Sequence, residues 1–267
     1  MIHDRPFIPF PPRHLGTHVS KLNFVQSTNM SVNQNSGRFR TQLGADYAIL
    51  TLSIASSILY LSKTRTTPSV SRMIIKTASI ALLSVLTITR GGPKLLAIAL
   101  GGGSVGDAFL AWDGDAAFLC GLGSFLVAHL FYIRLFVLTG AGLDRILAAS
   151  STTLEQDGGR WRLVVAVVLV AVFAPIMLSR LMTRVATDLR VPIVIYTTVI
   201  VCMVLAALTV EDGWVVAGAL MFTSSDGILA AEKFLISSKS SHAVWMPYAV
   251  WSLYYGGQLI ISFGLLP

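Results

Sequence analysis

Long apolar stretches alternate with short polar breaks over most of this chain. Eight such stretches follow residue 44, and each is close to the length of about 17–25 residues that a helix needs to cross a bilayer. The stretches cover residues 46–62, 68–89, 93–112, 116–138, 162–180, 191–209, 213–236 and 244–265. Within each stretch, apolar and polar residues do not alternate at every second position, as they do in the strands of a membrane β-barrel. The pattern therefore predicts an all-α polytopic membrane protein with eight transmembrane helices.

The breaks between the stretches carry turn-forming residues. Residues 90–93 read Arg-Gly-Gly-Pro, residues 112–115 read Trp-Asp-Gly-Asp, residues 150–160 are polar, and residues 211–213 read Glu-Asp-Gly. Since the breaks after the third and the sixth stretch are very short, we expect antiparallel neighbours there. We predict one eight-helix transmembrane domain over residues 45–267.

Residues 1–44 differ from the rest of the chain. They are rich in Pro near the start and in Ser, Asn and Gln further on, so we expect a disordered polar and basic tail. They hold no continuous apolar core of the kind that a secretory signal peptide needs, whereas a transit peptide stays open because Arg is present and acidic residues are few.

Composition supports the membrane class. Apolar residues make up 54% of the chain, charged residues only 12%, and the mean hydropathy is +0.71, whereas soluble domains contain about 25% charged residues. The net charge of +7 is scattered, which favours contact with lipid headgroups over nucleic acid. We expect a multi-pass protein of the endoplasmic reticulum or another endomembrane. Lys and Arg divide almost evenly between the two sides, so its orientation stays open.

Two aspartates lie inside apolar stretches in similar settings. Asp107 and Asp226 each follow a small residue and precede two residues and then Leu-Ala. A carboxylate at bilayer depth costs about 2.5–3.5 kcal/mol on insertion scales, so it stays there only when paired, neutralised or facing a polar cavity. The two lie in the third and seventh stretches, which run in the same direction and are consistent with a 4+4 parallel repeat. That direction allows both carboxyls to reach one cavity.

Other polar residues could support the aspartates. His129 shares a helical face with Gly121, Phe125 and Tyr132; it could take part in chemistry or only form an interhelical hydrogen bond.

Three further candidates lie in other stretches. Ser225 precedes Asp226 and could bond to it or to backbone. Gln258, in Tyr-Tyr-Gly-Gly-Gln at 254–258, is predicted to line a polar site, and Lys76 could bind a phosphate or balance an aspartate.

Some motifs are set aside. Residues 101–106 match Gly-x-Gly-x-x-Gly, but a dinucleotide fingerprint follows a strand and opens a helix, whereas this match lies inside an apolar helix. No metal-ligand spacing surrounds the single membrane histidine, and no Gly-x-Ser-x-Gly occurs. We expect neither a metal nor another cofactor.

Together these blocks resemble the YhhN-like lysoplasmalogenase family of multi-pass membrane proteins. The likeness rests on Gly106-Asp107, on the Ser-Phe-Leu-x-x-His-x-x-Tyr pattern ending at Tyr132, on Ser225-Asp226 and on residues 254–258, and it covers residues 46–267. The family's basic residue in the second helix corresponds to Lys76.

The resemblance implies hydrolysis of the vinyl ether bond of a lysoplasmalogen, a lysophospholipid, to a fatty aldehyde and glycerophospho-ethanolamine or -choline. This chemistry needs a proton for carbon, stabilisation of an oxocarbenium-like cation, and an activated water. Two carboxyls in different environments can divide these tasks, as in glycosidases. We expect Asp107 and Asp226 to form this pair, with the acid and base unassigned, His129 to tune or relay protons, and Tyr255 and Gln258 to orient water or the glycerol.

Two other functions remain open. Intramembrane Asp and His, glycine-rich helices and a repeat also fit a proton-coupled transporter. A lipid-binding membrane protein without catalysis is the third alternative.

Overall fold

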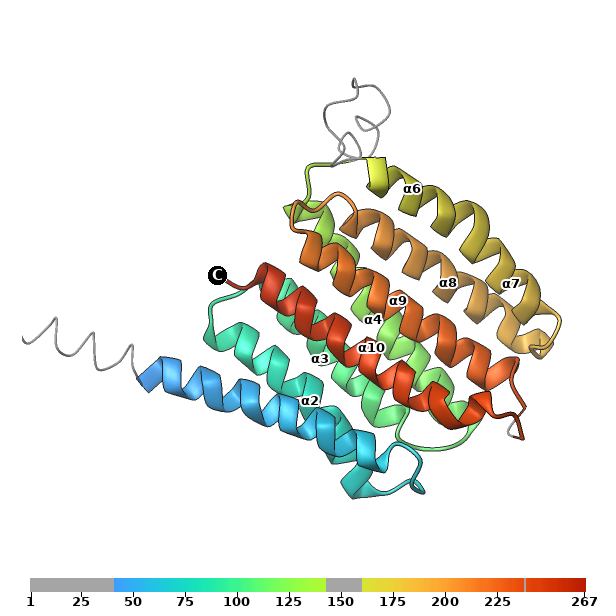
Figure 1. Cartoon of the computed structure of the whole chain (residues 1–267), viewed down its shortest axis with the longest axis horizontal. Helices are drawn as coiled ribbons and strands as arrows, with labels where there is room; N and C mark the ends of the chain where they lie inside the picture. The colour runs from blue at the N-terminus through green and yellow to red at the C-terminus, as the bar shows by residue number, and fades with distance from the viewer. Residues whose placement is uncertain (1–40, 143–159, 238) are drawn as a thin grey trace, which may run out of the picture. The chain divides into compact units, whose positions relative to one another are not determined.

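The structure, a computed structural model, describes residues 41–142, 160–237 and 239–267, and every regular element in these ranges is helical. The elements are the helix Thr41–Lys63, α2 (Val70–Thr89), α3 (Lys94–Phe109), α4 (Asp115–Thr139), α6 (Arg160–Val168), η2 (Leu169–Phe173), α7 (Ala174–Met182), α8 (Thr187–Ala207), α9 (Gly213–Phe234) and α10 (His242–Leu265). Helices α6, η2 and α7 follow one another without a break (Figure 1). Counted as one helix, Arg160–Met182, they bring the helices in the described ranges to eight. Residues 1–40 of the predicted tail lie outside the described residues. Its last four residues, 41–44, belong to the helix that begins at Thr41.

The expected number of membrane-crossing helices is not confirmed. Six described helices are long and apolar enough to cross a membrane; the other two are α3 and α10. Helix α3 has 16 residues, so it rises about 24 Å, against a hydrocarbon core of about 30 Å. It begins after Pro93 and ends at Phe109, before the turn at residues 110–111. Helix α10 is long enough, but it contains Pro247 and several polar side chains that face inward.

Large apolar side chains cover much of the surface of the described helices. Ile58, Ile88, Leu138, Val164 and Val191 each expose more than half of their area. Meanwhile polar groups such as Asp107, His129 and Gln258 are almost completely buried. This inversion is expected for a multi-pass membrane protein, whose outer surface contacts lipid.

Successive helices run in alternating directions, so α3 and α9 are parallel (Figure 1). Helix α3 packs between α2 and α4, α10 packs against α9 and α2, and α4 packs against α8. The parallel directions of α3 and α9 agree with the prediction from sequence; the 4+4 repeat itself stays a prediction.

Glycine allows the closest of these helix contacts. A Cβ at Gly218 of α9 would lie 2.7 Å from the Gly257 carbonyl oxygen of α10, and a Cβ at Gly257 would meet the Gly218 carbonyl at the same distance. No other residue fits between two backbones that approach this closely. This contact therefore fixes how α10 is turned relative to α9, and with it the direction of the side chains at 251, 254 and 258.

The helix from Arg160 to Met182 changes its winding in the middle. Pro175 in the first turn of α7 lacks a backbone N–H, and the π-helical turn Leu169–Phe173 precedes it. A π turn of this kind re-aims the side chains around it. Phe173 and Met177 lie beside Gly227 of α9, where a Cβ would come within 3.1 Å and 3.3 Å of them.

Candidate functional site

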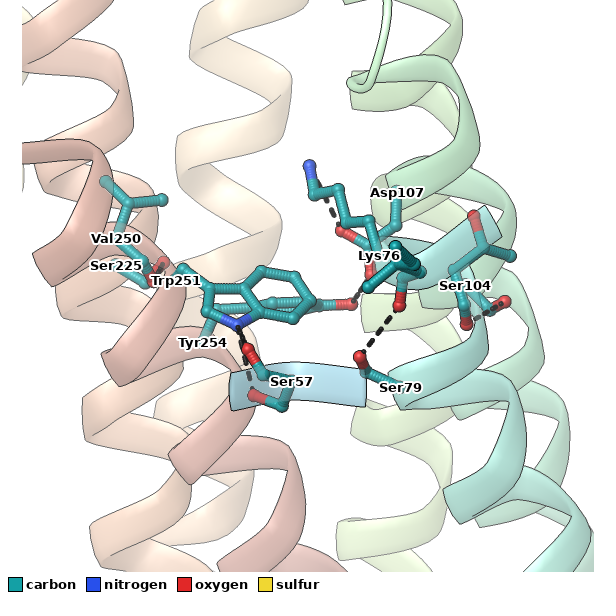
Figure 2. A network of polar contacts seen from close by, with 11 residues as sticks. Ser57, Lys76, Ser79, Ser104, Asp107, Ser225, Val250, Trp251 and Tyr254 are labelled. Carbon is teal, nitrogen blue, oxygen red and sulfur yellow. Dashed lines mark hydrogen bonds and ion pairs between the residues drawn. The ribbon is translucent and has the colours of Figure 1, made fainter. Parts of the chain in front are cut away.

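Asp107 lies in the last turn of α3 and is 1% exposed. Tyr254 of α10 donates its hydroxyl to Oδ2 at 2.9 Å, and the Lys76 ammonium of α2 lies 3.4 Å from Oδ1. Figure 2 shows these two side chains reaching the carboxyl from different helices. A cation and a hydroxyl donor both favour the ionised form of a carboxyl, so Lys76 and Tyr254 stabilise Asp107 as a carboxylate.

Lys76 is itself almost completely buried, at 8% exposure. Its ammonium lies 5.7 Å from the centroid of the Tyr60 ring and 5.9 Å from that of the Trp251 ring, close enough for cation–π contact with both. The Trp251 indole is held by hydrogen bonds from Nε1 to the carbonyl and the hydroxyl of Ser57 (Figure 2). Lys76 therefore belongs to the group of buried side chains around Asp107, together with Tyr254, Tyr60 and Trp251.

Asp226 lies in the middle of α9 and has a different set of partners. Tyr196 of α8 donates its hydroxyl to Oδ2 at 3.1 Å, and the Nε2 atom of His129 lies 3.5 Å from the same oxygen. The other ring nitrogen, Nδ1, is 2.6 Å from the carbonyl oxygen of Phe125. A carbonyl only accepts hydrogen bonds, so Nδ1 carries a proton.

This geometry links the protonation of His129 to that of Asp226. With Nδ1 protonated, Nε2 of a neutral ring is an acceptor, and it has no hydrogen-bond partner among the described residues. An acceptor that faces a carboxylate is unfavourable, so one proton belongs between the two groups, either on the carboxyl or on the ring. The His129–Asp226 pair is thus arranged to hold one proton, whereas the contacts of Asp107 favour the carboxylate without a proton.

Both aspartates line one cavity of about 750 Å³, within the range of small-molecule sites. Its inner part includes Lys76, Tyr254 and Trp251. Its outer part reaches the connections between helices and the helix ends beside them, where Arg65, Arg72, Asp113, Glu232 and Lys233 line it. These connections lie on one side of the helix assembly (Figure 1), so the cavity leads from the aspartates to one polar face.

A second, apolar pocket adjoins this cavity. It lies between α4, α7, α8 and α9, and its lining includes Phe173, Met177, Ile193 and Leu229. Asp226 lines both spaces, as do Leu110, Phe118, Phe125 and Leu229. Asp226 therefore stands where a polar chamber meets an apolar one.

Three predicted site residues hold helices together. Tyr255 shares a hydrogen bond of 2.8 Å with Ser53, which in turn donates to the carbonyl of Ser79. Tyr132 donates to the side-chain oxygen of Gln258, which is fully buried.

The third of these is Ser225, which donates to the carbonyl of Val250 at 2.9 Å, not to Asp226. Of Ser225, Tyr255 and Gln258, only Ser225 is among the residues that line the cavity.

The sequence did not identify three contacts of the site: Tyr254 with Asp107, Tyr196 with Asp226, and Trp251 with Lys76. Trp251, Tyr254 and Gln258 follow a spacing of three and four residues, which places them on one face of α10. That spacing could have identified Tyr254, whereas nothing along the chain pairs Tyr196 with Asp226. In the described ranges, no group of three His, Cys, Asp or Glu side chains is placed to hold a metal ion.

Long apolar helices around buried, paired carboxyls and an internal cavity define a multi-pass membrane protein with a site inside its helix assembly. Residues 71–265 match the YhhN family, and the chain belongs to that family. It is 31% identical over 187 residues to the protein named lysoplasmalogenase TMEM86B of Homo sapiens, covering 69% of each chain.

A second relative, of the same name, comes from Mus musculus. It is 30% identical over 203 residues, which cover 74% of this chain and 77% of the mouse protein. No solved structure matches the chain.

Proposed function

We propose that this protein is a membrane lysoplasmalogenase, which hydrolyses the vinyl ether bond of a lysoplasmalogen. The observation that carries the proposal is the pair of carboxyls, Asp107 and Asp226, which line one cavity but have different partners. A lysine ammonium lies beside Asp107, whereas a histidine ring lies beside Asp226. Membership of the YhhN family and the names of the human and mouse relatives support the same reaction.

The two adjoining spaces suit an amphiphilic substrate. The polar cavity has room and charges for the glycerophosphate end, and the apolar pocket suits the first carbons of the alkenyl chain. The vinyl ether joins these two halves of the lipid. Placed at the junction, it would lie beside the carboxyl of Asp226.

In the first step, the His129–Asp226 pair delivers its proton to the vinyl carbon that is farther from the ether oxygen. The double bond breaks as the new C–H bond forms, and the positive charge spreads over the other vinyl carbon and the ether oxygen. The carboxylate of Asp107 stabilises this oxocarbenium ion electrostatically, as a second carboxylate does in glycosidases.

In the second step, water adds to the cationic carbon and Asp107 takes the proton that the water loses, which gives a hemiacetal. In the third step, protonated Asp107 gives that proton to the glycerol oxygen as the C–O bond breaks. The His129–Asp226 pair regains a proton from the hemiacetal hydroxyl, and a fatty aldehyde and a glycerophospho-ethanolamine or -choline leave. Both carboxyls return to their starting states, so the cycle needs only water.

Lys76, Tyr254 and Tyr196 act by positioning. Lys76 and Tyr254 hold Asp107 ionised and oriented, and Tyr196 fixes one oxygen of Asp226. Tyr255, Gln258 and Ser225 hold the helices that carry these groups. Placement in the endoplasmic reticulum or another endomembrane stays a prediction.

The test is to give purified protein in nanodiscs a lysoplasmalogen and to measure released aldehyde, with a 1-acyl lysophospholipid as the substrate control. We expect aldehyde from the vinyl ether lipid and none from the ester. Asp107→Asn and Asp226→Asn should each lower the rate at least about 100-fold, the usual scale for losing an acid or base. Asp188→Asn, an exposed acid in the first turn of α8, is the matched control.

Full activity in either folded Asn variant would overturn the assignment of the carboxyls. No aldehyde from the wild-type protein, together with proton-dependent lipid flux in proteoliposomes, would favour a transporter over a hydrolase.

A further inference from the structure

We propose that the outer part of the cavity is a site for the zwitterionic headgroup, in which Arg72 binds the phosphate and Glu232 binds the amine. This inference rests on the proposed function. It also implies a choice between substrates: a primary ammonium, as in ethanolamine, is preferred over the quaternary ammonium of choline.

Arg72 is placed to receive an anion. It lies one helical turn outside Lys76 on the same face of α2, and both side chains line the cavity. One arm of its guanidinium donates to the carbonyl of Thr66 at 2.9 Å, which fixes its direction. Its Nε is buried and has no hydrogen-bond partner in the part of the chain that the structure describes. A held guanidinium with a free donor suits a phosphate oxygen.

Glu232 is the complementary charge. It is half-buried on α9, lines the same cavity, and forms no hydrogen bond or ion pair with the parts of the chain that the structure describes. The neighbouring Lys233 is engaged elsewhere, 3.4 Å from Asp115 and over the ring of Phe118. A half-buried carboxylate without a protein partner is a natural acceptor for a ligand cation.

The spacing along the two helices matches the lipid. From Lys76 to Arg72, α2 rises about 6 Å, and from Asp226 to Glu232, α9 rises about 9 Å. In a lysoplasmalogen the phosphorus lies about five bonds from the ether oxygen and the amine nitrogen about nine, or roughly 6 and 11 Å along an extended chain. With the vinyl ether at the aspartates, the phosphate reaches the level of Arg72 and the amine that of Glu232.

The preference follows from hydrogen bonding. A primary ammonium can donate N–H bonds to the carboxylate of Glu232, whereas a quaternary ammonium has no hydrogen to donate and keeps only the charge attraction. One hydrogen bond to a charged group is enough for about tenfold in affinity.

The experiment measures binding of two non-hydrolysable probes to purified protein in nanodiscs: 1-O-alkyl lysophosphoethanolamine and 1-O-alkyl lysophosphocholine. We expect the wild-type protein to bind the ethanolamine probe about tenfold more tightly. Glu232→Gln should remove most of this difference, Glu232→Asp should keep part of it, and Arg72→Gln should weaken both probes about equally. The controls are Asp188→Asn and Lys239→Gln, exposed charges that do not line the cavity.

The outcomes separate the two proposals. An unchanged preference in folded Glu232→Gln, or Arg72→Gln that binds both probes like wild type, would overturn the headgroup site even if vinyl ethers are hydrolysed. A wild-type protein that shows the preference and its loss in Glu232→Gln, yet releases no aldehyde from vinyl ethers, would support the headgroup site and reject the hydrolase.

Discussion

His129 directs its Nε2 atom at Oδ2 of Asp226, 3.5 Å away, while Nδ1 is bound to the carbonyl of its own helix at Phe125. The backbone contact fixes the ring so that only one nitrogen is left for the carboxyl. A histidine that served packing alone would not need its free nitrogen opposite a buried acid.

The first prediction concerns this pair. His129→Gln removes the group that shares the proton with Asp226, so kcat should fall about 10–100-fold while KM changes little. Tyr196→Phe, which removes the other contact of the same oxygen, should lower kcat less. Steady-state aldehyde release measures both variants. Equal and small effects in the two would show that His129 is only a packing residue.

The second prediction separates stability from catalysis at Asp107. Asp107→Asn leaves Lys76 as a buried cation without its counter-ion, which should lower stability on the order of 3 kcal/mol as well as remove activity. The double variant Lys76→Met/Asp107→Asn should recover most of the stability and none of the activity. Thermal unfolding in detergent and aldehyde release are the two measurements. Recovered activity in the double variant would mean that Asp107 only balances Lys76.

The third prediction uses a glycine to move a hydroxyl. A Cβ at Gly103 would lie 3.0 Å from the hydroxyl oxygen of Tyr254. Gly103→Ala should therefore push this hydroxyl away from Asp107 and lower the rate about as much as Tyr254→Phe, roughly tenfold for one hydrogen bond to a charged group. Combined with Tyr254→Phe, the alanine should add little further loss, because the phenyl ring leaves its Cβ free. Full additivity of the two rate effects would contradict this mechanism.

The fourth prediction tests the apolar pocket. Ala230 lines it, so Ala230→Leu should fill part of the space and raise KM for long-chain lysoplasmalogens more than for short-chain ones. The neighbouring Ala231 does not line the pocket, and Ala231→Leu is the matched control. A chain-length series of substrates gives the measurement. The same KM shift at every chain length would place the alkenyl chain elsewhere.

Much of this site could be predicted from the sequence because an ionisable residue inside a long apolar stretch is easily recognised. Asp107, Asp226 and His129 stand out in this way, and the helix count between the two aspartates predicts their common direction. Lys76 also stands out, but its contact with Asp107 depends on how α2 and α3 are turned toward each other.

Tyr254 and Tyr255 illustrate what the sequence could not decide. Adjacent residues on a helix point about 100° apart, so only one of the two can face Asp107. Which one does so depends on the rotation of α10, and the close contact of Gly218 with Gly257 sets that rotation. The sequence identifies both tyrosines as candidates, and the packing of α10 against α9 determines which of them faces Asp107.

The short reach of α3 has a consequence for product release. Helix α3 rises about 24 Å, about 6 Å less than a hydrocarbon core of about 30 Å, and Asp107 lies in its last turn. The cavity that Asp107 lines reaches the connections between helices, so water can approach the carboxylate from that side. In the proposed reaction, the headgroup fragment would leave through this cavity into the aqueous phase, whereas the aldehyde would partition sideways into the lipid. One reaction would thus send its two products into different phases, which works against their recombination.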